Sequence, residues 1–134
     1  MLDQQELLDA IINDYGDNGE MESDLKDSFI IFHEYDDSDY SGSSETIFWK
    51  DCKIYTVTDS HCSCNGLEWQ TPIEMSIEAL EHMVTNASYG VYEEHSANIV
   101  AGIGIAKYFK EKNIQKIEDL TDEDLTYLKL KFDV

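Results

Sequence analysis

The sequence TIFWKDCKIYTVT at residues 46–58 predicts a β-hairpin. Its two halves, residues 46–49 and 53–58, are rich in the β-branched and aromatic residues that are enriched in strands. The link Lys50-Asp51-Cys52 is short enough to join two antiparallel neighbours. This hairpin therefore predicts an antiparallel sheet, around which the other elements are expected to pack.

The chain before this hairpin contains one more strand and a helix. The run FIIFHEY at residues 29–35 is apolar and is bounded by acidic turn residues, so it predicts a strand. Residues 5–15 place Leu8, Ile11, Ile12 and Tyr15 on one helical face, and Gly16 is expected to end that helix. The polar residues 17–24 and the acidic residues 36–45 predict loops.

Three helices are predicted after the sheet. The first begins at Thr71, which heads a capping box, or at Ser76 as the alternative cap. The second begins at Ser96 as its cap, runs to about residue 112 and ends at Asn113, and the small residues between 101 and 106 favour close packing. The third begins at Thr121, before three acids that suit a helix N-terminus. We predict one α+β domain over residues 1–134, with an antiparallel sheet at about residues 28–70, an N-terminal helix and a C-terminal group of helices.

The chain is strongly acidic. Its 134 residues include 29 acidic residues and nine basic ones, all of them lysines, which gives a formal net charge of −20. Residues 1–50 contain 14 acids and 2 lysines, whereas residues 101–134 contain 7 acids and 6 lysines. A field of this sign repels phosphates and anionic lipids and attracts basic protein surfaces. Direct binding to nucleic acid or membrane is therefore not expected, whereas a basic protein partner is.

The sequence also predicts a cytoplasmic location. No apolar run approaches the roughly 20 residues needed to span a bilayer. The first residues lack the basic start of a signal peptide, and three cysteines suit a reducing compartment.

Cys52, His61, Cys62 and Cys64 supply thiols and an imidazole, the ligand types that zinc prefers. Their spacing lacks the usual Cys-x2-4-Cys pair, and buried structural thiols are the competing interpretation. The pattern that starts at Asp37 matches only the first half of a calcium loop, so an acidic hairpin tip is preferred there. No cofactor is expected unless these four residues bind zinc.

The stretch SHCSCNGLEW at residues 60–69, which follows KIYTV at 53–57 and precedes Pro72-Ile73-Glu74, resembles a signature of small phage and bacterial proteins of uncharacterised function. In that group a short β-hairpin leads into a His-Cys-Ser-Cys-x-Gly-Leu-Glu element, followed by a tryptophan and a Pro-x-Glu. The resemblance covers about a third of the chain. It implies an origin in a phage or mobile element. For a phage-encoded protein, the expected cytoplasmic location is the host cytoplasm.

The leading hypothesis is a non-enzymatic, phage-type accessory protein that binds a basic host protein. Its most concrete form is an inhibitor of host defence, of the anti-CRISPR or anti-restriction type, whose carboxylates stand where nucleic-acid phosphates would. The predicted partner-binding residues are Asp17, Glu20, Glu22, Asp24, Asp36, Asp37, Asp39, Tyr40 and Glu45. The alternatives are a zinc-binding or redox module built on the four Cys and His residues, and an enzyme of unrecognised type.

Overall fold

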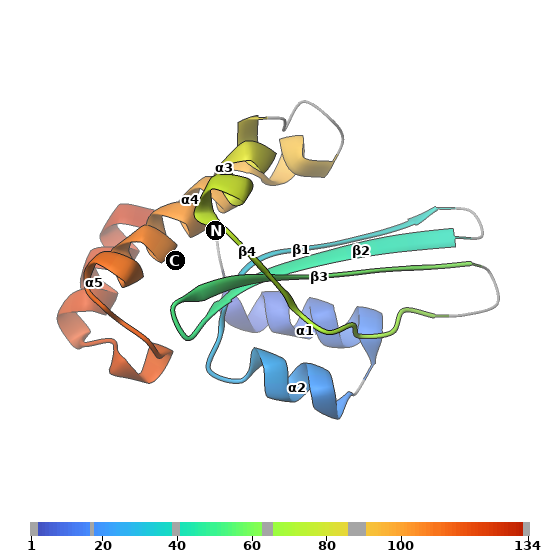
Figure 1. The fold of residues 1–134 in the computed structure, drawn as a ribbon, viewed down its shortest axis with the longest axis horizontal. Coiled ribbons are helices and arrows are strands. Elements are labelled where there is room, and N and C mark those ends of the chain that lie inside the picture. The colour runs from blue at the N-terminus through green and yellow to red at the C-terminus, as the bar shows by residue number, and fades with distance from the viewer. Residues whose placement is uncertain (1–2, 17, 39–40, 63–65, 86–90, 133–134) are drawn as a thin grey trace.

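The computed structural model describes residues 3–16, 18–38, 41–62, 66–85 and 91–132. Two helices come first and are followed by three long strands, a short strand and the C-terminal helices (Figure 1). The elements are α1 (Gln4–Tyr15), α2 (Gly19–Leu25), β1 (Phe29–Ser38), β2 (Ser41–Lys50), β3 (Lys53–His61), β4 (Ile73–Met75), α3 (Ile77–Thr85), α4 (Val91–Glu111), the 3-10 turn η1 (Ile117–Asp119) and α5 (Asp122–Phe132).

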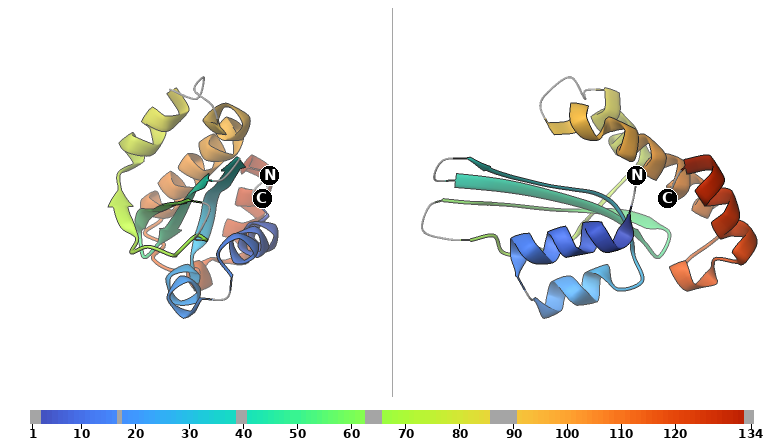
Figure 2. Two further views of the ribbon diagram at one scale, coloured as in Figure 1. Left: turned by 90° about the vertical axis from the view of Figure 1, so that its right-hand side faces the viewer. Right: turned by 180° about the vertical axis from the view of Figure 1, so that it is seen from behind.

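The strands form one antiparallel sheet in the order β1-β2-β3-β4. Helices α1 and α2 lie against one face, and α3 and α4 lie against the other (Figures 1 and 2). Helix α5 lies at the end of the sheet that carries the β2–β3 turn. The predicted α+β class is confirmed, with an N-terminal helix and C-terminal helices flanking an antiparallel sheet.

A bulge in β1 decides which side chains face which helices. Ile30 pairs with Phe48 and Phe32 pairs with Ile47, so Ile31 is an extra residue in β1. Ile31 and Phe32 both belong to the apolar cluster that includes α4, whereas Ile30 belongs to the cluster that includes α1 and α2. Beyond the bulge, the alternation of side chains between the two faces is therefore shifted by one residue.

The start of α1 is fixed both by its own cap and by the edge of the sheet. Asp3 caps the helix by accepting a hydrogen bond from the Glu6 backbone N–H at 3.1 Å. The Gln4 side chain donates to the Ile30 carbonyl at 2.9 Å and accepts from the Ile30 N–H at 2.7 Å. Gln4 thus pairs with the outer edge of β1 as a neighbouring strand would, which protects that part of the edge.

Helix α2 lies where a loop was predicted, so that prediction is wrong. The Asn18 side chain caps α2 by accepting from the Met21 N–H at 3.1 Å. Met21 and Leu25, one turn apart, are both buried beneath the sheet. Two apolar residues at this spacing, behind a good cap, outweigh the loop-favouring Gly19.

Strands β1 and β2 extend through most of the acidic stretch that was predicted as a loop. The ladder continues through Asp36 opposite Ser43 and Asp37 opposite Gly42, up to Ser38 opposite Ser41. The loop prediction is therefore wrong for residues 36–38 and 41–45, which are strand. Asp39 and Tyr40, in the middle of the partial calcium pattern, lie outside the described residues. Acidic residues are tolerated in this part of the hairpin because one face of the ladder is open to solvent. The side chain of Asp36, for example, is exposed.

The predicted helix start at Thr71 is also wrong. The residues after Pro72 form strand β4 and pair with β3, with Ile73 opposite Thr56. The helix begins later, where the Ser76 hydroxyl accepts from the Ala79 N–H at 3.0 Å. The alternative cap at Ser76 is thus confirmed. The helix does not begin earlier because the backbone N–H and C=O groups of residues 73–75 form their hydrogen bonds with β3.

Helix α4 begins at Val91 instead of Ser96, so the predicted cap lies inside the helix. Its end agrees with the prediction: Asn113 follows it with a left-handed φ of 55°. The small residues of α4 allow the expected close approach, because a side chain at Gly102 would meet Ile31 of β1.

The β2–β3 turn contains two non-glycine residues in the left-handed region. Asp51 and Cys52 have φ values of 52° and 66°, and they connect the paired residues Lys50 and Lys53. Positive φ at both central positions is the requirement of a type I′ turn, which Asn-Gly meets with least strain. The Cys52 thiol donates to the Ile114 carbonyl oxygen at 3.1 Å, which ties the turn to the segment after α4.

The double substitution Asp51→Asn/Cys52→Gly is expected to raise the free energy of unfolding by about 1 kcal/mol, because glycine removes the left-handed strain at Cys52. Thermal unfolding of the variant and the wild type measures the change. Asp51→Asn alone is the control, since it leaves the strained cysteine in place. A lower melting temperature for the double variant would mean that the thiol contact with Ile114 stabilises the fold by more than the strain costs.

Tyr108 joins α4 to α5. Its hydroxyl donates to Asp124 at 2.6 Å, and Asp124 also accepts from the Thr121 N–H at 3.0 Å in the predicted cap of α5. The hydrogen bond from Tyr108, followed by that from Thr121, lowers the pKa of Asp124 below its ordinary value of 3.8. The same bond to Asp124 is the main reason that the pKa of Tyr108 is raised to about 12.

The Tyr108–Asp124 bond is expected to stabilise the fold only over a defined pH range. The Asp124 contribution is present above the ordinary carboxyl pKa and is lost as pH falls through the lower folded pKa. The Tyr108 contribution is present below pH 10 and is lost as pH rises from 10 towards 12. The difference in melting temperature between wild type and Tyr108→Phe should be constant between about pH 5 and pH 9 and should shrink on both sides. Tyr127→Phe, which keeps this bond, should show no such dependence.

Candidate functional site

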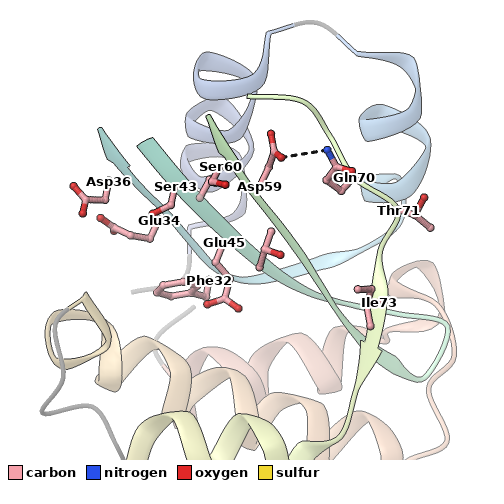
Figure 3. A pocket seen from close by; sticks show the side chains of 12 residues that line it. Phe32, Glu34, Asp36, Ser43, Glu45, Asp59, Ser60, Gln70, Thr71 and Ile73 are labelled. Atoms are coloured by element: carbon pink, nitrogen blue, oxygen red, sulfur yellow. Dashed lines mark hydrogen bonds between the residues drawn. The ribbon is translucent and has the colours of Figure 1, made fainter. Parts of the chain in front are cut away.

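A groove of about 980 Å³ lies on the face of the sheet beyond the part that α3 and α4 cover. Its floor is formed by β1, β2 and β3, and the segment that leads into β4 forms one side (Figure 3). Glu34, Asp36 and Glu45 project from β1 and β2 on the same side of the sheet. Among the described lining residues there is no lysine. The groove is therefore a carboxylate-bearing surface.

The strand register arranges the groove in rows that run across the sheet. The innermost row follows the pairs Phe32–Ile47, Ile47–Thr56 and Thr56–Ile73. Phe32 lies in the floor, and Ile73 is 66 % exposed at the rim. This row is mainly apolar and includes one exposed aliphatic side chain.

The next two rows are polar and acidic. Glu34 is opposite Glu45, which is opposite Thr58. One step further out, Asp36 is opposite Ser43. Successive rows on one face are two residues apart, or about 6.7 Å. Like charges directly opposite one another repel, so the Glu34–Glu45 pairing places two carboxylates of the same sign on neighbouring strands.

Glu45 and Asp59, two acidic residues at the groove, accept hydrogen bonds from neighbouring residues. The Thr56 hydroxyl donates to Glu45 at 3.2 Å. Asp59 accepts from the Glu68 backbone N–H at 2.7 Å and from Gln70 at 3.2 Å (Figure 3). Asp59 therefore holds the segment after β3 against the sheet, while Glu34, Asp36 and Glu45 provide the acidic surface.

The residues predicted to bind a partner separate into two groups. Asp36 and Glu45 line the groove, and Asp37 belongs to β1. Glu20 and Glu22 are exposed on α2, which packs against the opposite face of the sheet. The remaining members are Asp24, whose carboxylate accepts from the Trp69 indole at 2.8 Å, and Asp17, Asp39 and Tyr40, which lie outside the described residues. The structure thus forms two acidic surfaces, one on each side of the sheet.

Sequence analysis missed Glu34 as a member of the groove. The period of two along β1 places Glu34 on the same face as Asp36, so this grouping was detectable in the sequence. The pairing of Glu34 with Glu45 was not, because it depends on the register and on the bulge.

Of the proposed zinc ligands that the structure describes, Cys52 does not converge with His61 and Cys62. Cys52 lies in the turn at one end of β3 and His61 at the other end, about 26 Å away for a nine-residue strand. Both ring nitrogens of His61 make hydrogen bonds, one with the Tyr35 hydroxyl at 2.5 Å and one with the Cys62 carbonyl at 2.9 Å. Cys64 lies outside the described residues. Within the described ranges, no three His, Cys, Asp or Glu side chains are grouped to hold a metal ion.

His33 forms a buried polar chain between β1, β2 and α1. Its two ring nitrogens lie 2.7 Å from the Thr46 hydroxyl and 2.6 Å from the Asp14 carboxylate. This order of hydroxyl, imidazole and carboxylate is that of a nucleophile with its base and orienting group. Thr46, however, is completely buried and the His33 side chain is only 4 % exposed, so no substrate reaches the hydroxyl. The chain fixes α1 on the sheet.

Next to this chain lie two more buried hydroxyls, those of Tyr15 and Ser44. Within the part of the chain that the structure describes, neither meets the geometric limits of a hydrogen bond. Burial raises the pKa of Tyr15, although the nearby Ser44 hydroxyl acts in the opposite direction. The Tyr15 ring packs edge-on against the Trp69 ring, with 5.2 Å between the ring centroids. The main role of Tyr15 is therefore to pack in the core.

No protein-family model matches this chain, and no curated protein or solved structure shows significant similarity to it. In the described parts of the chain, no helix is both long and apolar enough to cross a membrane.

Proposed function

We propose that this chain is a non-enzymatic, phage-type accessory protein that binds a basic, nucleic-acid-binding host protein in the cytoplasm. The observation that carries this proposal is the groove in which Glu34, Asp36 and Glu45 project together, with no lysine among its described lining residues. In its most concrete form the protein inhibits a defence nuclease of the CRISPR or restriction type by occupying its nucleic-acid site.

The charge of the whole chain supports such a partner. A net charge of −20 attracts a basic surface over roughly a Debye length of 8–10 Å and accelerates the encounter. Proteins that bind nucleic acid present lysine and arginine to a row of phosphates. Carboxylates at about 6.7 Å along β1 and about 5 Å across to β2 offer a row of fixed negative charges in place of those phosphates.

A capture experiment tests the proposal. The immobilised protein is incubated with lysate of a bacterial host, and retained proteins are identified as salt is raised from about 50 to about 200 mM. We expect a basic nucleic-acid-binding protein that is released steeply over this range. An excess of double-stranded DNA should displace the chain from the purified partner, since the two would compete for one site.

Variants in which amides replace carboxylates show which acidic surface binds the partner. The groove variant Glu34→Gln/Asp36→Asn/Glu45→Gln should weaken binding to the captured protein at least about tenfold. The matched control Glu118→Gln/Asp119→Asn/Glu123→Gln has the same net charge but changes exposed residues near α5 and should bind nearly as wild type. Glu20→Gln/Glu22→Gln tests the acidic surface on α2. Retention of no basic protein at low salt, or equal binding by the groove and control variants, would contradict the proposal.

A further inference from the structure

We propose that helix α5 is the surface through which two copies of this chain associate, with the two α5 helices side by side and antiparallel. This contact is independent of the proposed binding by the acidic groove. Two features of α5 carry it. The fold leaves a large apolar side chain of this helix in solvent, and the charges of the helix are complementary to those of a second α5 in the reverse direction.

Helix α5 contacts the rest of the molecule through one side and leaves the other open. It lies next to α4 at the end of the molecule (Figures 1 and 2). Leu128 is buried against the core, whereas Leu130 is 84 % exposed, the largest exposure of any large apolar side chain in the described part of the chain. A single exposed leucine is ordinary on a protein surface, so the charges around it decide which partner suits this side.

Leu130 belongs to a stripe that runs the length of α5. Residues at positions i, i+4 and i+7 of a helix share one face, and Glu123, Tyr127 and Leu130 have this spacing. Lys131 follows Tyr127 by one turn and lies beside Leu130. All four side chains are exposed. The stripe therefore has a carboxylate at its first end, apolar side chains in its middle and an ammonium group at its last end.

A second α5 that runs in the reverse direction matches this stripe from end to end. Glu123 and Lys131 are about 12 Å apart along the helix axis, with Tyr127 midway between them. When two antiparallel helices pack with their Tyr127 residues at the centre, Glu123 of each copy lies beside Lys131 of the other. Asp122 and Lys129, which share the neighbouring side of the helix, pair across the contact in the same way.

The charges of α5 also exclude the parallel arrangement. A parallel pair would place the acidic first turns together and the lysines of the last turns together, and it would align the two helix dipoles. In the antiparallel pair each acid-lysine contact occurs twice, because the two copies are related by a two-fold axis. Leu130 of each copy is then covered by the other helix, which removes apolar surface from water.

The C-terminal part of the chain is also where two copies repel each other least. Residues 101–134 have 7 acids and 6 lysines, a net charge of −1, whereas residues 1–50 have a net charge of −12. At about 0.15 M salt the Debye length is about 8 Å, so charges on more distant parts of two copies are largely screened. The acidic groove extends towards the other end of the sheet, near Asp36, and stays open in such a dimer.

Sedimentation equilibrium of the full chain tests the proposal. At about 0.15 M salt, the mean mass should rise from 15.4 kDa towards twice this value as the concentration increases from about 1 µM to about 500 µM. Leu130→Ser should weaken the dimer at least about tenfold, because each dimer loses two apolar contacts. Its matched control is Ile73→Ser, which removes an exposed aliphatic side chain from β4 and should leave the dimer unchanged.

Charge reversal tests the antiparallel arrangement. Glu123→Lys and Lys131→Glu should each weaken self-association at least about tenfold, because each creates two like-charge pairs in the dimer. An equimolar mixture of the two variants should associate about as well as wild type, since one copy then carries lysine at both positions and the other carries carboxylates. In a parallel pair, neither variant alone would associate more weakly than wild type.

Three results would overturn the proposal. The first is a chain that stays monomeric at the highest concentration. The second is a dimer that Leu130→Ser leaves intact, because another surface would then form it. The third is a mixture of the two charge-reversed variants that associates no better than either alone. A monomeric chain that loses a captured host protein on Leu130→Ser would assign this side of α5 to that protein and would overturn the proposal as well.

Discussion

Substituting Gly102 by alanine is expected to lower the free energy of unfolding by about 2 kcal/mol, and substituting it by valine by about 3 kcal/mol or more. A Cβ atom at this position would overlap Cγ2 of Ile31 and lie 3.2 Å from its Cβ and Cγ1. Ile31 is buried at the bulge of β1, between the sheet and α4, so it has no space into which to move. This crowding outweighs the gain of about 1 kcal/mol that alanine normally brings to a helix.

Gly104→Ala provides the matched control in the same helix. Its Cβ would meet the ring of Phe132, which is only half-buried in the last turn of α5 and can shift outward. The gain in helix propensity is the same at both positions, so the difference between the two variants isolates the contact with Ile31. Chemical denaturation measures both. Equal stability of Gly102→Ala and Gly104→Ala would show that α4 is free to move away from the sheet.

Removing the imidazole of His33 is expected to lower the free energy of unfolding by about 3 kcal/mol. His33→Leu leaves the Thr46 hydroxyl completely buried without its partner, and it also removes the link to Asp14. The loss of its hydrogen-bond partner is less unfavourable for Asp14, because its side chain is 18 % exposed and reaches water. The cost should therefore arise mainly at the hydroxyl.

A double-mutant cycle tests this explanation. When both members of a buried hydrogen bond are replaced by apolar groups of similar shape, most of the loss is recovered. The variant His33→Leu/Thr46→Val should thus be more stable than His33→Leu alone, by about 1–2 kcal/mol. If adding Thr46→Val lowers stability further, the hydroxyl is not the group left unsatisfied, and the contact of His33 with α1 explains the loss instead.

Local patterns in the sequence predicted the helices and strands whose signals are self-contained. The 46–58 hairpin, the helix before Gly16 and the Thr121 cap all agree with the structure. The errors arise where contacts with residues distant in the sequence determine the secondary structure. Thr71 and Glu74 form a good capping box in the sequence, but residues 73–75 pair with β3. Residues 19–25 are acidic, but Met21 and Leu25 are buried against the sheet.

The candidate site was predictable only in part for the same reason. Composition located the negative charge in the first hundred residues, and Asp36 and Glu45 were named. Their meeting with Glu34 on one face requires the register between β1 and β2, which no local signal contains. The separation of Cys52 from His61, in turn, follows from β3 being nine residues long without a bend.

The extra residue at Ile31 has a consequence for how this fold tolerates insertions and deletions. Ile31 and Phe32 both face α4, so the bulge is what keeps Glu34 and Asp36 on the open face although one residue more is present. Deleting Ile31 would leave Ile30 opposite Phe48 and Phe32 opposite Ile47, so Glu34 and Asp36 would keep their side of the sheet. If Ile31 were kept in a strand without the bulge, Glu34 and Asp36 would turn towards α1 and His33 would come to the open side. Anyone who grafts residues 29–45 onto another sheet must therefore either keep the bulge or remove Ile31 with it.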